Sequence, residues 1–480
     1  SHGWWEFCDV ICSDSTGRPV KYHTQEVNMT KFLHNGKQGA PSFRDRYGIE
    51  YAYLSGAMYK GIATKELVVA MGKSGLMGFL GTGGVPLDKV EESIVYIKKH
   101  LAPGHAYGMN LLNNLAHPEL EKEMVELYLK HQVPVVEASA YISVSQPLIR
   151  YRLSGIHRNE RGEVFTPNRV IAKLSRPEVA EAFLRPANQR EVHKLVEKGE
   201  LTHEEAALAP SIPVADDICV EADSGGHTDR GRLIALLPGI TALRDRLVKE
   251  HGYKNRVHVG AAGGIGTPTA AAACFVLGAE FITTGSINQC TVESGISETV
   301  KDMLQQMDVQ DTDYAPAGDM FEIGARVQVL KKGVLFPSRA NKLYELYSRF
   351  KSIDDIDTKT RRQIEDKYFK RSFEDVWLET CRYYEKSAPA VLEKARRSPK
   401  VKMSLIFRWY FVHSSRLAME GDSGQKVDFQ VHCGPALGAF NQWVKGTPLE
   451  NWRNRHVADI GRRIMDAAAE LLSTATGVEL

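Results

Sequence analysis

The sequence lacks the features that mark membrane, secreted and nucleic-acid-binding proteins. No apolar run approaches the roughly 18 residues that a membrane-spanning helix needs. The first residues, Ser1 to Trp5, show no charged-then-apolar signal pattern, so we expect a cytoplasmic protein. Neither sign of charge dominates, since 61 basic and 59 acidic residues leave a formal net charge of +2. This balance gives no support to bulk binding of nucleic acid.

Cysteine is also scarce, with seven residues scattered along the chain. Cys8 and Cys12 have the spacing of half a metal site, but no second pair with ligand spacing follows them. We therefore expect reduced cysteines and no metal centre.

What the sequence does contain is ample core-forming material, with 43% hydrophobic and 25% charged residues over 480 positions. A chain of this length predicts one large domain with an addition. Short apolar runs alternate with amphipathic helices such as 87–100 and 118–131, which predicts a parallel sheet, and eight such runs indicate an α/β fold of the (β/α)8 TIM-barrel type. The predicted strands are Tyr51–Leu54, Leu76–Leu80, His105–Leu111, Val133–Ala138, Val170–Leu174, Ile218–Ala222, Val257–Ala261 and Glu280–Thr284.

Three further regions surround this barrel, which we place at residues 46–300. Residues 1–45 are predicted to pack on it through Trp4, Trp5 and Phe7. The long interval at about 176–216 reads as a helical insertion between two strands. From 301 to 480 the pattern predicts an added helical region without strands, with its clearest helices at 344–350, 373–384, 390–397 and 457–472.

Small residues cluster at the carboxyl ends of the predicted strands, which is where a parallel barrel has its active site. Gly263 and Gly264 precede a predicted helix capped by Thr267, and Thr284-Gly285-Ser286 ends the next strand. A glycine turn before a helix N-terminus presents backbone N–H groups to an anion. These two neighbouring loops favour a phosphate site over glycines that only make tight turns. A dinucleotide fold is less consistent, because the G-x-G-x-x-G spacing fails.

Three polar side chains at strand ends are candidates for chemistry. His227 can exchange a proton near neutral pH, or it can be an ordinary surface histidine. Lys173 needs an anionic partner, which can be a bound cofactor or a salt bridge to Glu221 or Asp223. Asn110 can bind the edge of a cofactor or cap its own loop.

Taken together, these segments resemble the FMN barrels that include nitronate monooxygenases and flavin enoyl reductases. Two longer stretches, 321–330 and 433–443, resemble the PfaD-type FMN-dependent enoyl reductases of trans-acyltransferase polyketide synthases and polyunsaturated fatty acid synthases. The resemblance runs from about residue 45 to the C-terminus. It is carried by Tyr53-Leu-Ser-Gly-Ala-Met-Tyr-Lys-Gly-Ile-Ala63, Gly108-Met-Asn110, Pro134-Val-Val-Glu-Ala-Ser139, Glu221-Ala-Asp-Ser-Gly-Gly-His227, Ala262-Gly-Gly-Ile265, Thr284-Gly-Ser286, Phe321-Glu-Ile-Gly-Ala-Arg-Val-Gln-Val-Leu330 and Cys433-Gly-Pro-Ala-Leu-Gly-Ala-Phe-Asn-Gln-Trp443.

The resemblance implies a noncovalent FMN and catalysis by His227 and Lys173. NADPH would reduce the flavin, which would pass a hydride to Cβ of an enoyl thioester. His227 would then supply the proton for Cα or polarise the thioester oxygen. The residues implied in FMN binding are Ser55, Gly56, Ala57, Met58, Asn110, Lys173, Gly225, Gly226, Gly263, Gly264, Ile265, Thr284, Gly285 and Ser286.

The same resemblance implies a trans-acting enoyl reductase whose partners are an acyl carrier protein and a polyketide or fatty acid synthase, and it leaves a homodimer open. Residues 388–416 hold seven basic residues against one acidic residue, so this stretch is either a docking face for an acidic carrier protein or a solvated helix. Two other functions remain open. One is a nitronate monooxygenase, and the other is a non-catalytic component of a large synthase.

Overall fold

The computed structural model describes residues 12–13, 19–20, 33–34, 37–113 and 118–476. The packing predicted for Trp4, Trp5 and Phe7, and the position of Cys8, lie outside these residues.

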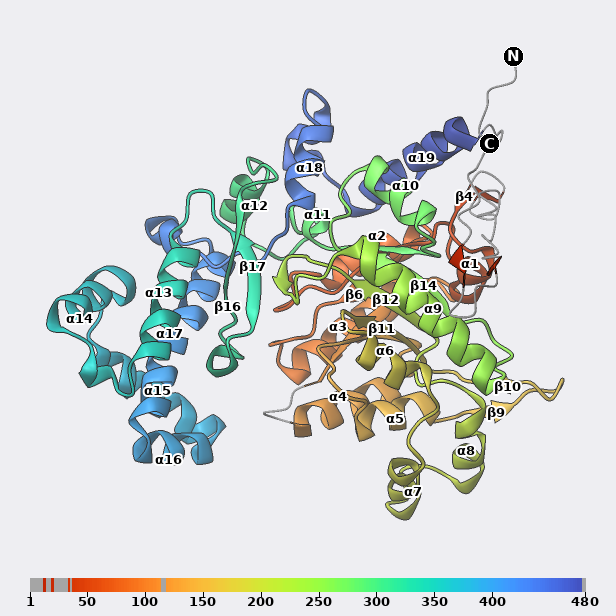
Figure 1. Ribbon diagram of the computed structural model, residues 1–480, viewed down its shortest axis with the longest axis horizontal. Helices are drawn as coiled ribbons and strands as arrows, with labels where there is room; N and C mark the ends of the chain where they lie inside the picture. The colour runs from red at the N-terminus through yellow and green to blue at the C-terminus, as the bar shows by residue number, and fades with distance from the viewer. Residues whose placement is uncertain (1–11, 14–18, 21–32, 35–36, 114–117, 477–480) are drawn as a thin grey trace.

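Eight parallel strands close into a barrel, which confirms the predicted fold (Figure 1). Each strand overlaps one of the eight predicted segments, and their order around the barrel follows the chain. Most of these strands are buried on both faces, which explains why they read as continuous apolar runs. The strands are β5 (Tyr53–Ser55), β6 (Met77–Leu80), β7 (Gly108–Leu112), β8 (Val135–Ser139), β11 (Arg169–Leu174), β12 (Asp217–Glu221), β14 (His258–Ala262) and β15 (Ile282–Thr284).

Amphipathic helices cover the outside of the barrel. In α3, for example, Val90, Ile94 and Ile97 recur at helical spacing and are buried. Thr267 caps α10, since its hydroxyl accepts from the N–H of Ala270 at 3.2 Å. The helices are α2 (Lys65–Lys73), α3 (Leu87–His100), α4 (Pro118–Lys130), α5 (Gln146–Leu153), α6 (Pro177–Leu184), α9 (Leu233–His251) and α10 (Pro268–Val276).

The interval at 176–216 contains three helices, and they differ in role. α6 packs beside β11 and α9, so it takes the place of a regular barrel helix. Only α7 (Gln189–Glu197) and α8 (His203–Leu208) are additional, and α7 packs on α5. A short hairpin of β9 (His157–Arg158) and β10 (Val164–Phe165), which the sequence analysis did not predict, precedes β11.

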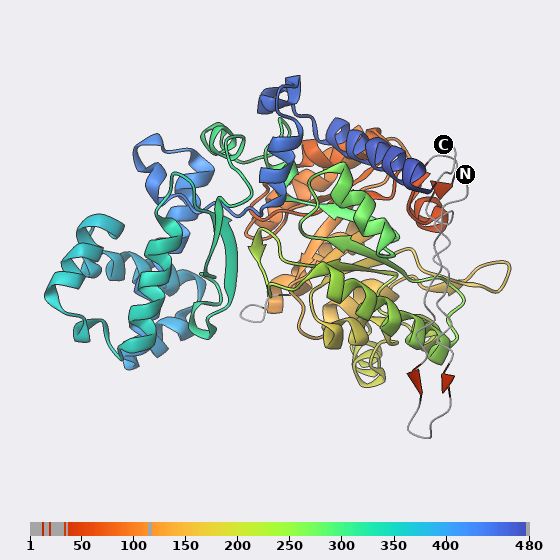
Figure 2. The same cartoon turned by 45° about the horizontal axis from the view of Figure 1, so that its top comes forward.

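The eighth place in the helical layer is taken by the last helix, α19 (Val457–Thr476). It packs against α10 and α2, and Figures 1 and 2 show it running beside α10. Gly461 lets it approach β5 closely, because a Cβ atom there would lie 2.8 Å from the ring of Tyr53. The chain therefore leaves the barrel after β15 and returns to it with α19.

Between these points the chain builds a second region with its own apolar core. The prediction that no strands follow residue 300 is wrong, because β16 (Thr312–Pro316) and β17 (Arg326–Leu330) form an antiparallel hairpin. Val327 and Val329 turn into the core of this region, where they join Phe321, Phe336 and Phe411. The helices between β15 and α19 are α11 (Ser286–Gln289), α12 (Glu298–Leu304), α13 (Phe336–Arg349), α14 (Thr358–Ile364), α15 (Phe373–Ser387), α16 (Pro389–Arg397), α17 (Pro399–Glu420) and α18 (Ala436–Trp443). Of these, α13 to α17 contribute to the second core, whereas α11, α12 and α18 pack on the core of the barrel.

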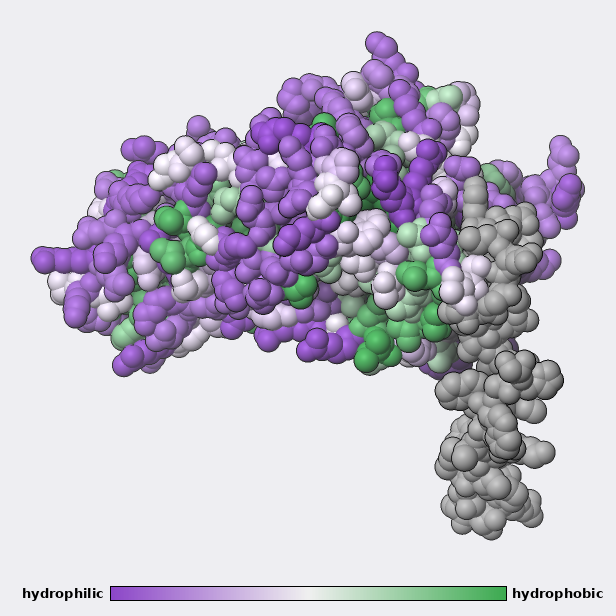
Figure 3. All heavy atoms as spheres, turned by 90° about the horizontal axis from the view of Figure 1, so that it is seen from above, coloured by the Kyte–Doolittle hydropathy of each residue, from purple (hydrophilic) through white to green (hydrophobic). Residues whose placement is uncertain are grey.

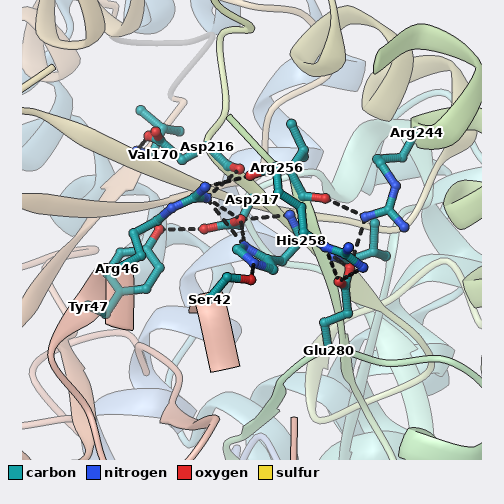
Figure 4. A network of polar contacts seen from close by, with 12 residues as sticks. Ser42, Arg46, Tyr47, Val170, Asp216, Asp217, Arg244, Arg256, His258 and Glu280 are labelled. Carbon is teal, nitrogen blue, oxygen red and sulfur yellow. Dashed lines mark hydrogen bonds and ion pairs between the residues drawn. The ribbon is translucent and has the colours of Figure 1, made fainter. Parts of the chain in front are cut away.

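The amino-terminal end of the barrel is closed by α1 (Pro41–Tyr47). Phe43 stacks on Phe281 inside the barrel, with ring centroids 4.2 Å apart. Beside α1 lies a network of buried charged side chains around Asp217 (Figure 4). The Asp217 carboxylate accepts hydrogen bonds from Arg46 at 2.8 Å and from the Tyr47 hydroxyl at 2.7 Å. A site at this end of a barrel serves stability, since catalysis belongs to the opposite end.

Hydrophilic side chains cover most of the face shown in Figure 3, with apolar side chains in small groups between them. Among the described helices, none has the length and apolar character needed to cross a membrane. The described residues also contain no cluster of three or more His, Cys, Asp or Glu side chains arranged for a metal ion.

Candidate active site

Two adjacent glycine loops lie at the carboxyl ends of β14 and β15, as predicted. Gly263 has a φ of +91°, and a Cβ atom there would lie 2.7 Å from the carbonyl oxygen of Ala222, so packing requires glycine. Gly264 and Gly285 differ, because a Cβ atom at either would meet no described atom within 4 Å. The backbone of both loops therefore borders open space, which suits the close approach of a ligand phosphate.

A third loop, from the C-terminal region, closes on these two. The N–H of Gly434 donates to Ser286 Oγ at 2.9 Å, and Gly266 faces the carbonyl of Ala436 so closely that a Cβ atom would lie 2.0 Å from it. In the loop that follows β12, the buried hydroxyl of Ser224 has no hydrogen-bond partner among the described residues. Gly225 is also fixed by packing, since its Cβ would lie 2.7 Å from the backbone of Cys433. The donors and the space present here fit a phosphate-bearing cofactor.

Two of the hydroxyls implied in cofactor binding are engaged inside the protein. Asn288 Nδ2 donates to Ser55 Oγ and to Thr284 Oγ1, both at 2.9 Å, and the Tyr53 hydroxyl lies 2.6 Å from Thr284 Oγ1. Ser55, Thr284 and Asn288 are buried. Both hydroxyl oxygens therefore already accept a hydrogen bond within the protein. The sequence analysis did not identify Asn288 as a site residue, and no motif in the sequence points to it.

Lys173 lies between two carboxylates at the ends of neighbouring strands. Its Nζ is 3.3 Å from Glu221 and 3.8 Å from Glu137. Burial opposes the charge on Lys173, but both carboxylates outweigh it and raise the pKa of the ammonium above its usual value. The salt bridge to Glu221, one of the two partners considered for this lysine, is therefore present. Glu137 was not predicted, although a charged residue in a buried strand is a signal that could have identified it.

Glu137 also ties the β5 loop to the β7 and β8 strands. Its Oε2 accepts from the N–H of Ala57 at 3.2 Å, which fixes the Gly56-Ala57-Met58 loop. Asn110 Nδ2 donates to the carbonyl of Glu137 and to Ser139 Oγ, both at 3.1 Å. The amide nitrogen of Asn110 is thus used within the protein. Burial raises the pKa of the Glu137 carboxyl, with Lys173 opposing and Glu221 adding to this shift.

His227 stands on a short strand, β13 (Gly226–His227), that pairs with β17 of the C-terminal region. Its Nε2 is 2.8 Å from Oδ1 of Asp319, and its side chain is 50% exposed. Partial burial disfavours the charged form, but the Asp319 carboxylate raises the pKa of His227 above its usual value. Asp319 was not predicted, because it reaches the site only through a hairpin that the sequence analysis missed.

A second histidine, His432, lies beside the first and was also missed. β17 holds both, since Val327 pairs with His227 and Val329 bridges to His432. The His432 ring stacks on Tyr59 with centroids 4.8 Å apart, and Gln430 Nε2 donates to its Nε2 at 2.8 Å. Burial and the neighbouring His227 lower the pKa of His432 to about 3, so it stays neutral.

Comparison with known proteins agrees with this fold. The family model for nitronate monooxygenase matches residues 43–333, and the model for the inserted helical domain of [acyl-carrier-protein] S-malonyltransferase matches residues 350–429. The enoyl reductase domain of MlnA, from the macrolactin biosynthesis cluster of Bacillus amyloliquefaciens, is 49% identical with a TM-score of 0.89, over 92% of this chain and 99% of that one. FabK from Thermotoga maritima, at 19% identity over 91% of this chain and 98% of that one, shares the fold with a TM-score of 0.53.

Two curated relatives are longer than this chain. The polyketide biosynthesis protein PksE of Bacillus subtilis is 58% identical over 90% of this chain and 56% of its own length. A component of the polyunsaturated fatty acid synthase of a Thraustochytrium species is 44% identical over 92% of this chain and 30% of its own length. The chain thus spans about half of the first of these relatives and about a third of the second. It belongs to the nitronate monooxygenase family and, within it, to the PfaD-type enoyl reductases of polyketide and polyunsaturated fatty acid synthases.

Proposed function

We propose that this chain is a trans-acting enoyl reductase that uses FMN and NADPH to reduce the 2,3-double bond of enoyl thioesters on an acyl carrier protein. The observation that carries the proposal is its likeness, over nearly the whole of that chain, to a solved enoyl reductase domain. The synthase relatives support a polyketide or polyunsaturated fatty acid synthase as the partner. A cytoplasmic location and a homodimer remain predictions from the sequence.

FMN fits the residues at the strand ends. Its phosphate would bind at Gly264, Gly285 and the loop that carries Ser224, where open space and an unpaired hydroxyl are present. The ring would lie at the Gly56-Ala57 loop, which Glu137 fixes. When bound, the flavin would supply hydride transfer.

The protein's own part is to position the substrate and handle the proton. Hydride addition at Cβ gives an enolate with negative charge on the thioester oxygen, and Cα must then accept a proton. We assign the donation of that proton to His227, which is partly exposed at the strand ends. Lys173 is held in its charged form by Glu137 and Glu221, so it can stabilise negative charge nearby.

Neither alternative function has an observation that favours it. A nitronate monooxygenase would consume oxygen without NADPH, and the family model of that name ends at residue 333, before most of the helical region. A non-catalytic synthase component would not need the open glycine loops or the His227–Asp319 contact.

The purified protein is expected to be yellow and to release FMN on denaturation, because the loops offer one phosphate site. Anaerobic NADPH should bleach the flavin absorbance, and an enoyl thioester should then restore it. FAD in place of FMN, or a colourless protein that takes up no FMN, would contradict the cofactor. A flavin that reacts with oxygen and nitronate but not with NADPH would favour the monooxygenase.

Some basic side chains of the stretch at 388–416 bind other residues of the protein, so fewer are available for docking than the composition implied. Lys400 donates to the carbonyls of Tyr347 and Phe350 and so caps α13, and Arg396 pairs with Glu393 at 2.8 Å. By contrast, Lys394 and Arg397 form no ion pair with another described residue and lie exposed on α16.

Reversing Lys394 and Arg397 to glutamate tests this surface without breaking those contacts. The KM for a carrier-bound enoyl substrate should rise about three- to tenfold, and the effect should shrink with salt. A small thioester should react as before. Lys249→Glu with Lys254→Glu, at and just beyond the C-terminal end of α9, is the matched control. Equal effects on both substrates indicate a folding defect, and no effect on either places docking elsewhere.

A further inference from the structure

The carboxylate that contacts His227 comes from outside the barrel. Asp319 lies in the loop between β16 and β17, and its Oδ1 is 2.8 Å from His227 Nε2. β17 also pairs with the strand that carries His227. His227 thus stands on one strand of a small sheet, and Asp319 stands in the loop that joins the other two strands of the same sheet.

This contact decides which nitrogen of His227 is free. Asp319 accepts a hydrogen bond, so Nε2 carries a proton and Nδ1 is the nitrogen left for other partners. A neutral imidazole of this tautomer has only a lone pair at Nδ1, whereas the imidazolium has a proton there as well. His227 can thus donate from Nδ1 only while it is charged.

The charged groups around His227 come from four elements. Asp319 on the hairpin and Glu221 at the end of β12 favour its positive charge, and Lys173 on β11 opposes it. His432, on the same edge of β17, stays neutral and so adds no repulsion. Lys60, like His227, lowers the pKa of His432. Asp319 in turn is held in its ionised form, since His227 outweighs the effect of burial and lowers the pKa of the carboxyl.

We propose that Asp319 is a positioning residue that keeps His227 in its charged, Nδ1-donating form, so that the hairpin of the C-terminal region completes the active site of the barrel. This rests on the proposed function. In the step it supports, a hydride from NADPH has been added at Cβ, and the electron pair of the resulting enolate takes the proton from Nδ1. The Nδ1–H bond breaks as the Cα–H bond forms. His227 is left neutral, with its Nε2–H still hydrogen-bonded to the Asp319 carboxylate, and a proton from solvent then returns to Nδ1.

The sign of the pH dependence follows from this arrangement. A donor with a raised pKa stays protonated as pH increases, and its activity is lost only when pH passes that value. In Asp319→Asn the pKa of His227 falls, so the alkaline loss of kcat should begin at lower pH. A lower pKa lowers the protonated fraction of His227 at alkaline pH. We expect a loss of kcat at pH 8.5 that is several-fold larger than the loss at pH 6, and unchanged FMN binding.

A second readout follows His227 itself. In protein labelled with ¹³C-histidine, the His227 resonance is assigned by its absence in His227→Gln, and its titration is recorded in the wild type and in Asp319→Asn. Asp313→Asn is the matched control, because Asp313 is an exposed carboxylate on the same hairpin. Asp319→Glu should keep much of the wild-type titration.

The outcomes separate the proposal from the function on which it rests. The proposal is overturned if His227 titrates at or below its ordinary value in the wild type, or if Asp319→Asn and Asp313→Asn give the same titration and the same pH profile. If Asp319→Asn does not fold, the wild-type titration alone decides. A protein that fails to reduce any enoyl thioester, but whose His227 titration moves in Asp319→Asn, overturns the proposed function and leaves the contact intact.

Discussion

Replacing His227 with alanine is expected to lower turnover of an enoyl thioester by about 10²–10⁴-fold, the range typical of a lost general acid. The side chain lies at the carboxyl ends of the barrel strands and makes its one described side-chain contact with Asp319. Because the His227 side chain is not one of the proposed phosphate contacts, FMN should stay bound and NADPH should still reduce it. Stopped-flow absorbance separates flavin reduction from reoxidation by the enoyl substrate.

His456→Ala is the control for this experiment, since His456 is also an exposed histidine that pairs with a carboxylate, Glu293 at 2.9 Å. It directly precedes α19, outside the proposed site, and its replacement should leave both half-reactions unchanged. Equal rates in His227→Ala and the wild type would make His227 a bystander. Loss of flavin from His227→Ala would instead give the residue a structural role.

The second large effect is expected at the opposite end of the barrel. Asp217→Ala should lower the free energy of unfolding by about 3–5 kcal/mol, because it leaves Arg46 without its partner in a region excluded from water. Asp217 is fully buried and also accepts from the backbone N–H of His258 at 2.8 Å and from its Nδ1 at 2.6 Å. Urea unfolding, followed by circular dichroism, measures the change.

Acid sensitivity gives this prediction a second measurement. Burial opposes the charge on Asp217, but Arg46, His258 and Tyr47 outweigh it and lower the pKa of the carboxyl. A lowered pKa contributes stability that is fully present above the unfolded value, near 4, and is lost as pH falls through the folded value. Asp217→Asn should therefore be less stable at neutral pH but lose less stability on acidification. Asp229→Asn, which breaks an exposed pair with Arg176, should change stability by at most about 1 kcal/mol. Similar losses in both variants would contradict this account.

The barrel could be predicted from the sequence because its signals are local. Each strand is a short apolar run, and each following helix shows its own spacing of buried residues, as Val90, Ile94 and Ile97 do in α3. The position of the glycine loop was predicted for the same reason, since Gly263 and Gly264 directly precede the capped helix α10.

The parts that were missed depend on contacts between distant segments. Asp319 and His432 meet His227 only because β17 pairs with both segments, and β17 itself looked like part of a helical region. The hydrogen-bond partners of Asn110 and Ser55 were also missed. Whether such a side chain bonds to the protein or to a ligand depends on residues distant in the sequence, here Glu137 and Asn288. The eighth barrel helix was taken for part of the added region, since nothing in α19 itself tells where it packs.

The position of α19 has a consequence for how the protein is made. During synthesis, β15 leaves the ribosome with residue 284, while the helix that covers the seam between α10 and α2 begins only at residue 457. Until then the outer face of β5, including the Tyr53 ring that Gly461 later contacts, has no cover from α19. A nascent barrel would expose apolar surface throughout the synthesis of the intervening region, and such surface attracts chaperones or aggregates. Fragments that stop short of residue 457 are therefore expected to be recovered mainly as insoluble protein, even when they include every strand of the barrel.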